Sequence, residues 1–157
     1  MPWAVGDGLR AGSVLAAAVI VLAVLGTAPA FAGLPEWLLL AGVALSPVIV
    51  CGVAGFLARR TGRGLGAAAV PAVIAGAIGG MAAGLSFLGL HQIFYDTVST
   101  EPEKILNFQK SGLSSMREYL VRTDLLSVAL GAALGAAGGG LVGAIGAAVG
   151  GHSDRAA

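Results

Sequence analysis

The chain has 157 residues, of which 57% are hydrophobic and only 11% are charged, and its mean hydropathy is +0.90. Soluble domains carry about 25% charged residues, so this composition argues against an ordinary water-soluble fold. The net charge of +1 and the lack of a basic patch with interleaved aromatic residues argue against a nucleic-acid-binding protein.

Four long runs of the sequence contain no charged residue, and each is long enough to cross a bilayer. A hydrocarbon core about 30 Å thick needs a helix of roughly 20 apolar residues, whereas a helix in water needs a polar face. The sequence therefore predicts an all-α integral membrane protein with one membrane domain over residues 1–157. The four predicted transmembrane helices cover residues 11–28, 37–58, 70–95 and 125–149.

The first predicted span is rich in valine, leucine and alanine, and its lack of a sustained row of small residues favours a lipid-facing helix. Arg10 precedes this run, and the small residues Ala30 and Ala32 follow it, which is also the pattern of a cleavable signal peptide. Asp7, however, lies where such a peptide is normally basic, and proteins with several spans seldom need a removable signal. We favour a retained first span, with cleavage of residues 1–32 as the alternative.

The second predicted span contains Pro47 near its middle, directly after Ser46. Proline removes one backbone hydrogen bond and usually kinks a helix, and a neighbouring hydroxyl can satisfy the freed carbonyl in a membrane. We favour a static kink over a gating hinge. Cys51 is the only cysteine and is expected to be a buried small hydrophobic side chain, so the sequence offers neither a disulfide nor a Cys/His metal site.

Small residues recur at every fourth position in the third and fourth predicted spans. Such a row lets the backbone of a second helix approach closely within a membrane. We expect the two rows to pack against each other inside the chain, and the alternative is that one of them mediates a homo-oligomer. Pro71 suits the first turn of a helix, so the third span is expected to begin near Val70. The expected helix-packing residues are Ala72, Gly76, Gly80, Gly84, Gly131, Gly135, Gly139 and Gly143.

The third span ends in a polar group formed by His91, Gln92, Tyr95 and Asp96. On a continuous helix His91 and Tyr95 share one face, and Gln92 and Asp96 share the next. We interpret this group as a cap at the outer membrane surface. The alternatives are a proton or cation site, or a single haem-iron or quinone site around His91.

The connector between the third and fourth spans has the pattern of an amphipathic helix at residues 100–123. Thr100 and Glu103 form a capping-box pattern, and Gly112 is expected to divide the segment into two short helices. The apolar side is expected to lie on the membrane surface, and the alternative is a docking surface for another protein. Asp124 is expected to cap the fourth span. The apolar residues on this side are Leu106, Leu113, Met116 and Leu120.

Arginines concentrate in the short loop between the second and third spans, which contains Arg59, Arg60 and Arg63. Short cytoplasmic loops carry an excess of lysine and arginine. This loop and both termini are therefore predicted to be cytoplasmic, in a multi-pass protein of the cell membrane. The high alanine, glycine and arginine content is typical of a bacterium with GC-rich DNA.

The predicted spans contain no mid-membrane Asp, Glu, Lys or Arg, the residue types that usually form proton relays and ion pathways. The sequence also lacks a P-loop and a serine nucleophile in a strained turn. It therefore predicts a non-catalytic protein without cofactor or metal, either a structural or accessory subunit of a membrane complex or a homo-oligomer packed through its glycine rows. The alternative is a channel or facilitator for a small or uncharged solute. The expected partners are the lipid bilayer and other membrane subunits or further copies of the chain, and not nucleic acid.

Overall fold

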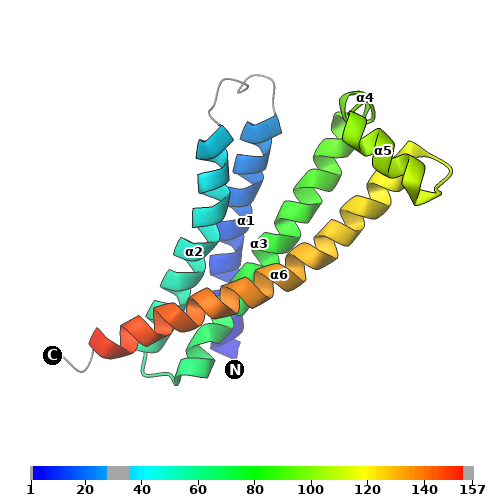
Figure 1. The fold of residues 1–157 in the computed structure, drawn as a ribbon. Helices are drawn as coiled ribbons and strands as arrows, with labels where there is room; N and C mark the ends of the chain where they lie inside the picture. The colour runs from blue at the N-terminus through cyan, green and yellow to red at the C-terminus, as the bar shows by residue number, and fades with distance from the viewer. Residues whose placement is uncertain (1, 28–35, 154–157) are drawn as a thin grey trace.

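The computed structural model describes residues 2–27 and 36–153, and every element in these two ranges is an α-helix (Figure 1). The all-α class is thus confirmed for the part of the chain that the structure describes. Ala30 and Ala32 are the small residues on which the signal-peptide alternative depends, and they lie outside the described residues. The helices are α1 (Pro2–Thr27), α2 (Glu36–Arg60), α3 (Leu65–Ile93), α4 (Tyr95–Val98), α5 (Pro102–Ser111) and α6 (Met116–Ser153).

Within the described ranges, three helices are long and apolar enough to cross a membrane. They are Trp3–Leu25 within α1, Leu65–Ile93, which is α3, and Met116–Gly151 within α6. The chain therefore has the character of a multi-pass membrane protein. The fourth predicted span, at 37–58, coincides with α2, whose charged residues lie only at its two ends, and its crossing of the membrane is part of the proposal below.

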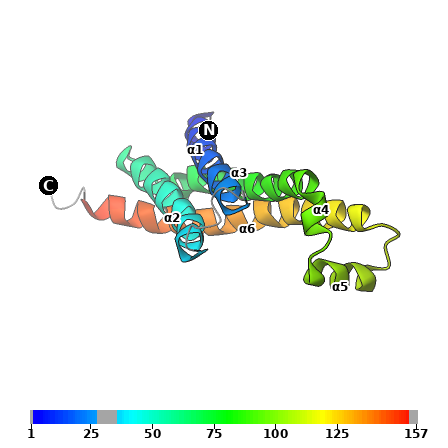
Figure 2. The same cartoon turned by 90° about the horizontal axis from the view of Figure 1, so that it is seen from above.

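The four long helices form two hairpins that join at one end and separate toward the other. Helices α1 and α2 form the first hairpin, and α3 and α6 form the second (Figure 1). Seen from above, the hairpins cross so that α1 lies against α3 and α2 against α6 (Figure 2). The joined end, which includes both described chain ends, is called the basal end here. Helices α4 and α5 lie at the opposite, distal end of the second hairpin.

Glycine-to-glycine contacts hold α3 against α6. A Cβ atom added at Gly76 would collide with the carbonyl group of Gly135, and one added at Gly80 would collide with that of Gly131. Because the backbones approach this closely, only a residue without a side chain fits at these positions. The two predicted rows therefore face each other within one chain. The other predicted packing residues extend the same contact, with Ala72 against Gly139 and Gly143, and Gly84 against Val128.

A neighbouring row of small residues on α6 receives α2. A Cβ atom added at Gly55 would collide with the carbonyl of Gly143, and one added at Gly146 with that of Gly52. Cys51 is fully buried, as expected for a small hydrophobic side chain. Small side chains thus let all four long helices converge at the basal end. The buried residues there form two clusters, Leu15, Cys51, Ala72 and Ala75 in one and Ala58, Ala68 and Ala147 in the other.

The expectation that the first span faces lipid is wrong for one side of α1. Gly8 and Gly12 lie directly against the side chains of Ile74 and Ile78 on α3, and Leu15 is only 2% exposed. Here bulky isoleucines of one helix fill the space above glycines of the other. Two glycines make a single four-residue step, which is too short a pattern to predict a packing face.

Two of the long helices begin earlier than predicted. Helix α3 begins at Leu65, so Pro71 lies inside it rather than in its first turn. Helix α6 begins at Met116, so Asp124 is an interior residue and not a cap. In both cases neither a proline nor a glycine pair separates the observed start of the helix from the predicted one, and a backbone in a membrane must satisfy its own hydrogen bonds. The helix therefore extends outward until a turn ends it.

The predicted cap of the connector helix is also wrong. Glu101, and not Thr100, is the N-cap of α5, because Pro102 takes the first helical position. The hydroxyl of Thr100 instead donates to the carbonyl of Thr97 at 2.8 Å. Gly112 ends α5 in the left-handed conformation at φ 70°, a conformation that glycine adopts without steric cost. The predicted break at Gly112 is therefore confirmed, but the expected second short helix is wrong, because the residues from Met116 onward belong to the long helix α6.

Candidate functional site

A buried polar contact joins α3 and α6 near their distal end. Nδ1 of His91, in the last turn of α3, lies 3.0 Å from each carboxylate oxygen of Asp124 on α6. Since an ionised carboxylate only accepts hydrogen bonds, Nδ1 carries the proton that is donated. The two side chains are 17% and 5% exposed, and Asp124 is the only buried charged residue among those the structure describes. A buried charge needs such a partner, so this pair links the two helices.

A second polar contact lies beside the first. Nε of Arg117, in the first turn of α6, donates to Oε1 of Gln92 at 3.2 Å. The Arg117 guanidinium also lies 5.7 Å from the ring centre of Tyr95. Nε2 of Gln92 is buried and has no hydrogen-bond partner within the described ranges. His91, Gln92, Tyr95, Arg117 and Asp124 together are called the distal cluster.

Three of the four residues predicted for this polar group belong to the distal cluster, and one does not. His91, Gln92 and Tyr95 contact side chains of α6. Asp96 is exposed and lies outside the cluster. Because α3 ends at Ile93 and α4 begins at Tyr95, the four residues are not on one continuous helix, and the predicted pairing of faces is not kept.

The sequence pattern does not predict the cluster residues on α6 as members of a polar site. Arg117 falls within the predicted connector helix at residues 100–123, and Asp124 is predicted only as a cap of the fourth span. The positions of two cluster residues relative to the predicted spans could have indicated the contact. Asp124 is the last charged residue before the fourth uncharged run, and His91 lies near the end of the third run. Antiparallel neighbours bring residues of equal depth together, so these two positions meet once the third and fourth spans pack on each other.

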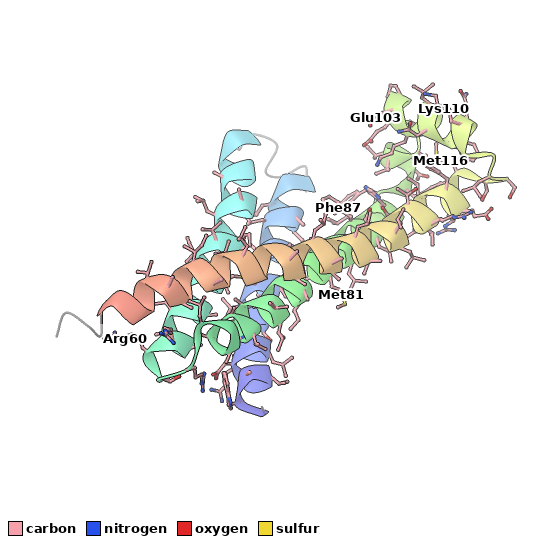
Figure 3. The ribbon with its side chains drawn as sticks, turned by 60° about the horizontal axis from the view of Figure 1, so that its bottom comes forward. Arg60, Met81, Phe87, Glu103, Lys110 and Met116 are labelled. Carbon is pink, nitrogen blue, oxygen red and sulfur yellow. The ribbon has the colours of Figure 1, made fainter. Side chains whose placement is uncertain are left out.

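The predicted apolar side of the connector is divided between two helices. Leu106 lies on α5 and is 50% exposed, whereas Leu120 lies on α6 and is 1% exposed. Leu113 lies in the turn between the two helices, and Met116 is the first residue of α6. The structure therefore does not bring these four residues onto one face. Figure 3 shows the charged Glu103 and Lys110 on the side of α5 away from α6.

An apolar cavity of about 370 Å³ lies where the two hairpins diverge. It is called the apex cavity here, and all four long helices contribute to its walls. Pro47 of α2 and Gly138 of α6 are among the lining residues. A Cβ atom added at Gly138 would have no atom within 4 Å, so this part of the cavity is open. Its small-residue lining lets a further helix or a small apolar molecule come close to the backbone.

The distal cluster has the geometry of a helix-to-helix contact. Its imidazole and carboxylate lie between α3 and α6, and their low exposure leaves little room for a substrate. No three His, Cys, Asp or Glu side chains gather in a metal-binding group within residues 2–27 and 36–153. The arrangement is therefore suited to holding the distal ends of two helices together.

The chain matches no protein-family model, no curated protein and no solved structure.

Proposed function

We propose that the chain is a non-catalytic structural or accessory subunit of the cell membrane, with α1, α2, α3 and α6 as four transmembrane helices and both termini in the cytoplasm. Helix α2 supports the fourth crossing because it has 25 residues. At the α-helical rise this is roughly 37 Å, which exceeds the hydrocarbon core of about 30 Å. Its close contact with α6, through Gly52 and Gly55, supports a crossing beside that helix.

The observation that carries the proposal is the divergence of the two hairpins around the apex cavity. The glycine rows of α3 and α6 already pack on each other within the chain, so we do not propose them as the surface that binds other subunits. The space between the hairpins instead exposes small residues of the cavity, such as Gly138, beside large apolar ones, such as Leu134 at 71% exposure. We propose that a transmembrane helix of another subunit occupies this space.

Native mass spectrometry of the protein, extracted gently from its own membrane, tests this proposal. We expect it to arrive bound to another polypeptide. Gly138→Leu adds a large side chain to the apex cavity at a position where a Cβ atom meets nothing within 4 Å, and it should abolish that association. Gly89→Leu is the matched control, because Gly89 also has no atom near its added Cβ and lies outside the cavity. Arrival of the chain alone, or equal losses in the two variants, would contradict the proposal.

A second candidate function is a facilitator for a small uncharged solute, and the apex cavity beside Pro47 favours it. In this case purified protein in liposomes should accelerate the entry of glycerol, and Pro47→Ala should change the rate by restoring the backbone hydrogen bond that proline removes from α2. Protein-free liposomes provide the baseline. A closed homo-oligomer in the mass spectrum would favour this candidate over the accessory subunit.

A further inference from the structure

A second cavity, of about 430 Å³, lies between α1 and α2 toward the basal end. It is called the basal groove here, and apolar side chains of both helices line most of it. Among these, Val14, Val53 and Leu57 are 61%, 50% and 56% exposed. Because these side chains face outward, the groove opens sideways toward the hydrocarbon that surrounds a membrane helix. Apolar residues of both helices continue along the groove, from Val14 on α1 and from Ile49 to Leu57 on α2, which suits an acyl chain.

The charged residues of the groove are Arg10, Arg63 and Asp7. Asp7 forms an ion pair with Arg63, with 3.4 Å between Oδ2 and Nη1. Arg10 is exposed and pairs with no other residue that the structure describes. The groove therefore carries one net positive charge. Arg59 and Arg60 lie at the same basal end and raise the positive potential there.

Contacts with neighbouring residues hold the Arg63 guanidinium in place. The central carbon of this guanidinium lies 3.2 Å from the ring centre of Trp3. The backbone carbonyl of Arg63 also accepts a hydrogen bond from the side chain of Arg59. The ion pair with Asp7 uses one of the five N–H donors of the guanidinium, so others remain for an anion. An arginine that is already positioned loses little conformational freedom when it binds a phosphate.

We propose that the basal groove binds an anionic phospholipid, with an acyl chain along its apolar length and the phosphate between Arg10 and Arg63. Guanidinium groups bind phosphate through charge-assisted hydrogen bonds, and basic pockets between transmembrane helices recognise anionic headgroups. The combination of an apolar groove open to lipid with two arginines among its lining residues selects a molecule that has both parts. A soluble phosphate would match only the arginines.

The headgroup half of the site is tested by native mass spectrometry of the detergent-purified chain with equal amounts of dioleoyl phosphatidylglycerol and dioleoyl phosphatidylcholine. We expect preferential retention of phosphatidylglycerol, and Arg10→Gln should weaken its binding about fivefold. Arg63→Gln should act in the same direction. Arg60→Gln is the matched control, because Arg60 lies at the same end, on the last turn of α2 (Figure 3). Arg60 is not among the residues that line the groove.

The acyl-chain half is tested by filling the groove from an exposed position. Val14→Trp should reduce retention of phosphatidylglycerol about fivefold or more, because the indole occupies the path of the chain. Val21→Trp is its control, since Val21 is similarly exposed on α1, at 56%, but does not line the groove. Both substitutions are at surface positions, and size-exclusion profiles would verify that the fold is kept.

Three outcomes would overturn the proposal. Equal losses in Arg60→Gln and Arg10→Gln would reduce the effect to diffuse charge at the basal end. An unchanged affinity in Val14→Trp would remove the acyl chain from the groove. Displacement of the lipid by an equal concentration of glycerol 3-phosphate would assign the arginines to a soluble anion. Arg10→Gln decides the headgroup question should Arg63→Gln fail to fold, because Arg10 is exposed and forms no ion pair with a described residue.

Discussion

At the residue scale, the burial of Asp124 makes the stability of the fold depend on a single hydrogen-bond partner among the described residues. Its side chain is 5% exposed, and its carboxylate depends on His91 for its hydrogen bond. Replacing His91 with leucine leaves this charge buried without a partner, and breaking such a pair costs about 3 kcal/mol or more. We expect His91→Leu to lower the free energy of unfolding by about that amount, as measured by SDS titration in mixed micelles.

The double variant and an exposed acid separate pairing from other effects. His91→Leu combined with Asp124→Leu replaces both partners with apolar groups, which is often close to neutral, so much of the stability should return. Asp96→Asn removes an exposed carboxylate of the same region and should change stability by less than about 0.5 kcal/mol. If the double variant were as unstable as the sum of its two single variants, the pair would hold no coupling energy.

Individual residues were predictable from the sequence where their environment is local. Cys51 is in an apolar run and is buried, and Gly112 interrupts an amphipathic pattern and ends a helix. The partner of His91 was not predictable in the same way, because Asp124 lies 33 positions away along the chain. Only the packing of α3 on α6 brings the two together, so the assignment of Asp124 to a cap followed from its sequence neighbours alone.

At the element scale, the α3–α6 contact depends on backbone atoms that cannot move aside. A Cβ atom at Gly80 would meet the carbonyl of Gly131, whereas one at Gly89 on the same helix meets nothing within 4 Å. Gly80→Leu must therefore separate the two helices, which we expect to cost about 3 kcal/mol or more. Gly89→Leu should cost less than about 1 kcal/mol. Thermal unfolding of the two variants in detergent provides the comparison.

A disulfide assay adds a structural readout for this contact. Cysteines placed at Ala83 and Val128, near the contact of Gly84 with α6, should cross-link under mild oxidation in a Cys51→Ala background. Gly80→Leu should slow this cross-linking, and Gly89→Leu should leave it unchanged. Equal stability and equal cross-linking in the two variants would mean that the helices do not rely on this close approach.

Helix type was predictable because long uncharged runs and the need for internal backbone hydrogen bonds allow little else in a membrane. Helix ends were less predictable. The beginning of α6 at Met116 depends on an amphipathic segment that continues into an apolar one without a break. The packing face of α1 was not predictable for another reason. Gly8 and Gly12 pack against large isoleucine side chains of α3 and not against a matching row of small residues.

At the scale of the whole molecule, the crossing of the two hairpins could not be derived from the sequence. The repeat of small residues predicts close contact between α3 and α6, but it does not set the angle at which α1 and α2 lie across them. That angle depends on the residue that packs against each glycine. Examples are Ile78, whose side chain packs on Gly12, and Gly52, whose backbone packs on Gly146. The divergence of the hairpins and the apex cavity are consequences of these contacts.

The number of crossings and their direction form one prediction about the whole molecule. We expect cysteines at Thr61, in the turn between α2 and α3, and at Glu36, at the start of α2, to react on opposite sides of the membrane. Arginines around the α2–α3 turn favour the cytoplasm for Thr61, and Ser111 at the end of α5 should share the outer side with Glu36. A membrane-impermeant maleimide on intact cells, followed by lysis and a second label, makes the measurement in a Cys51→Ala background. Labelling of Glu36→Cys on the same side as Thr61→Cys would show that α2 does not cross, and would leave the three spans of α1, α3 and α6.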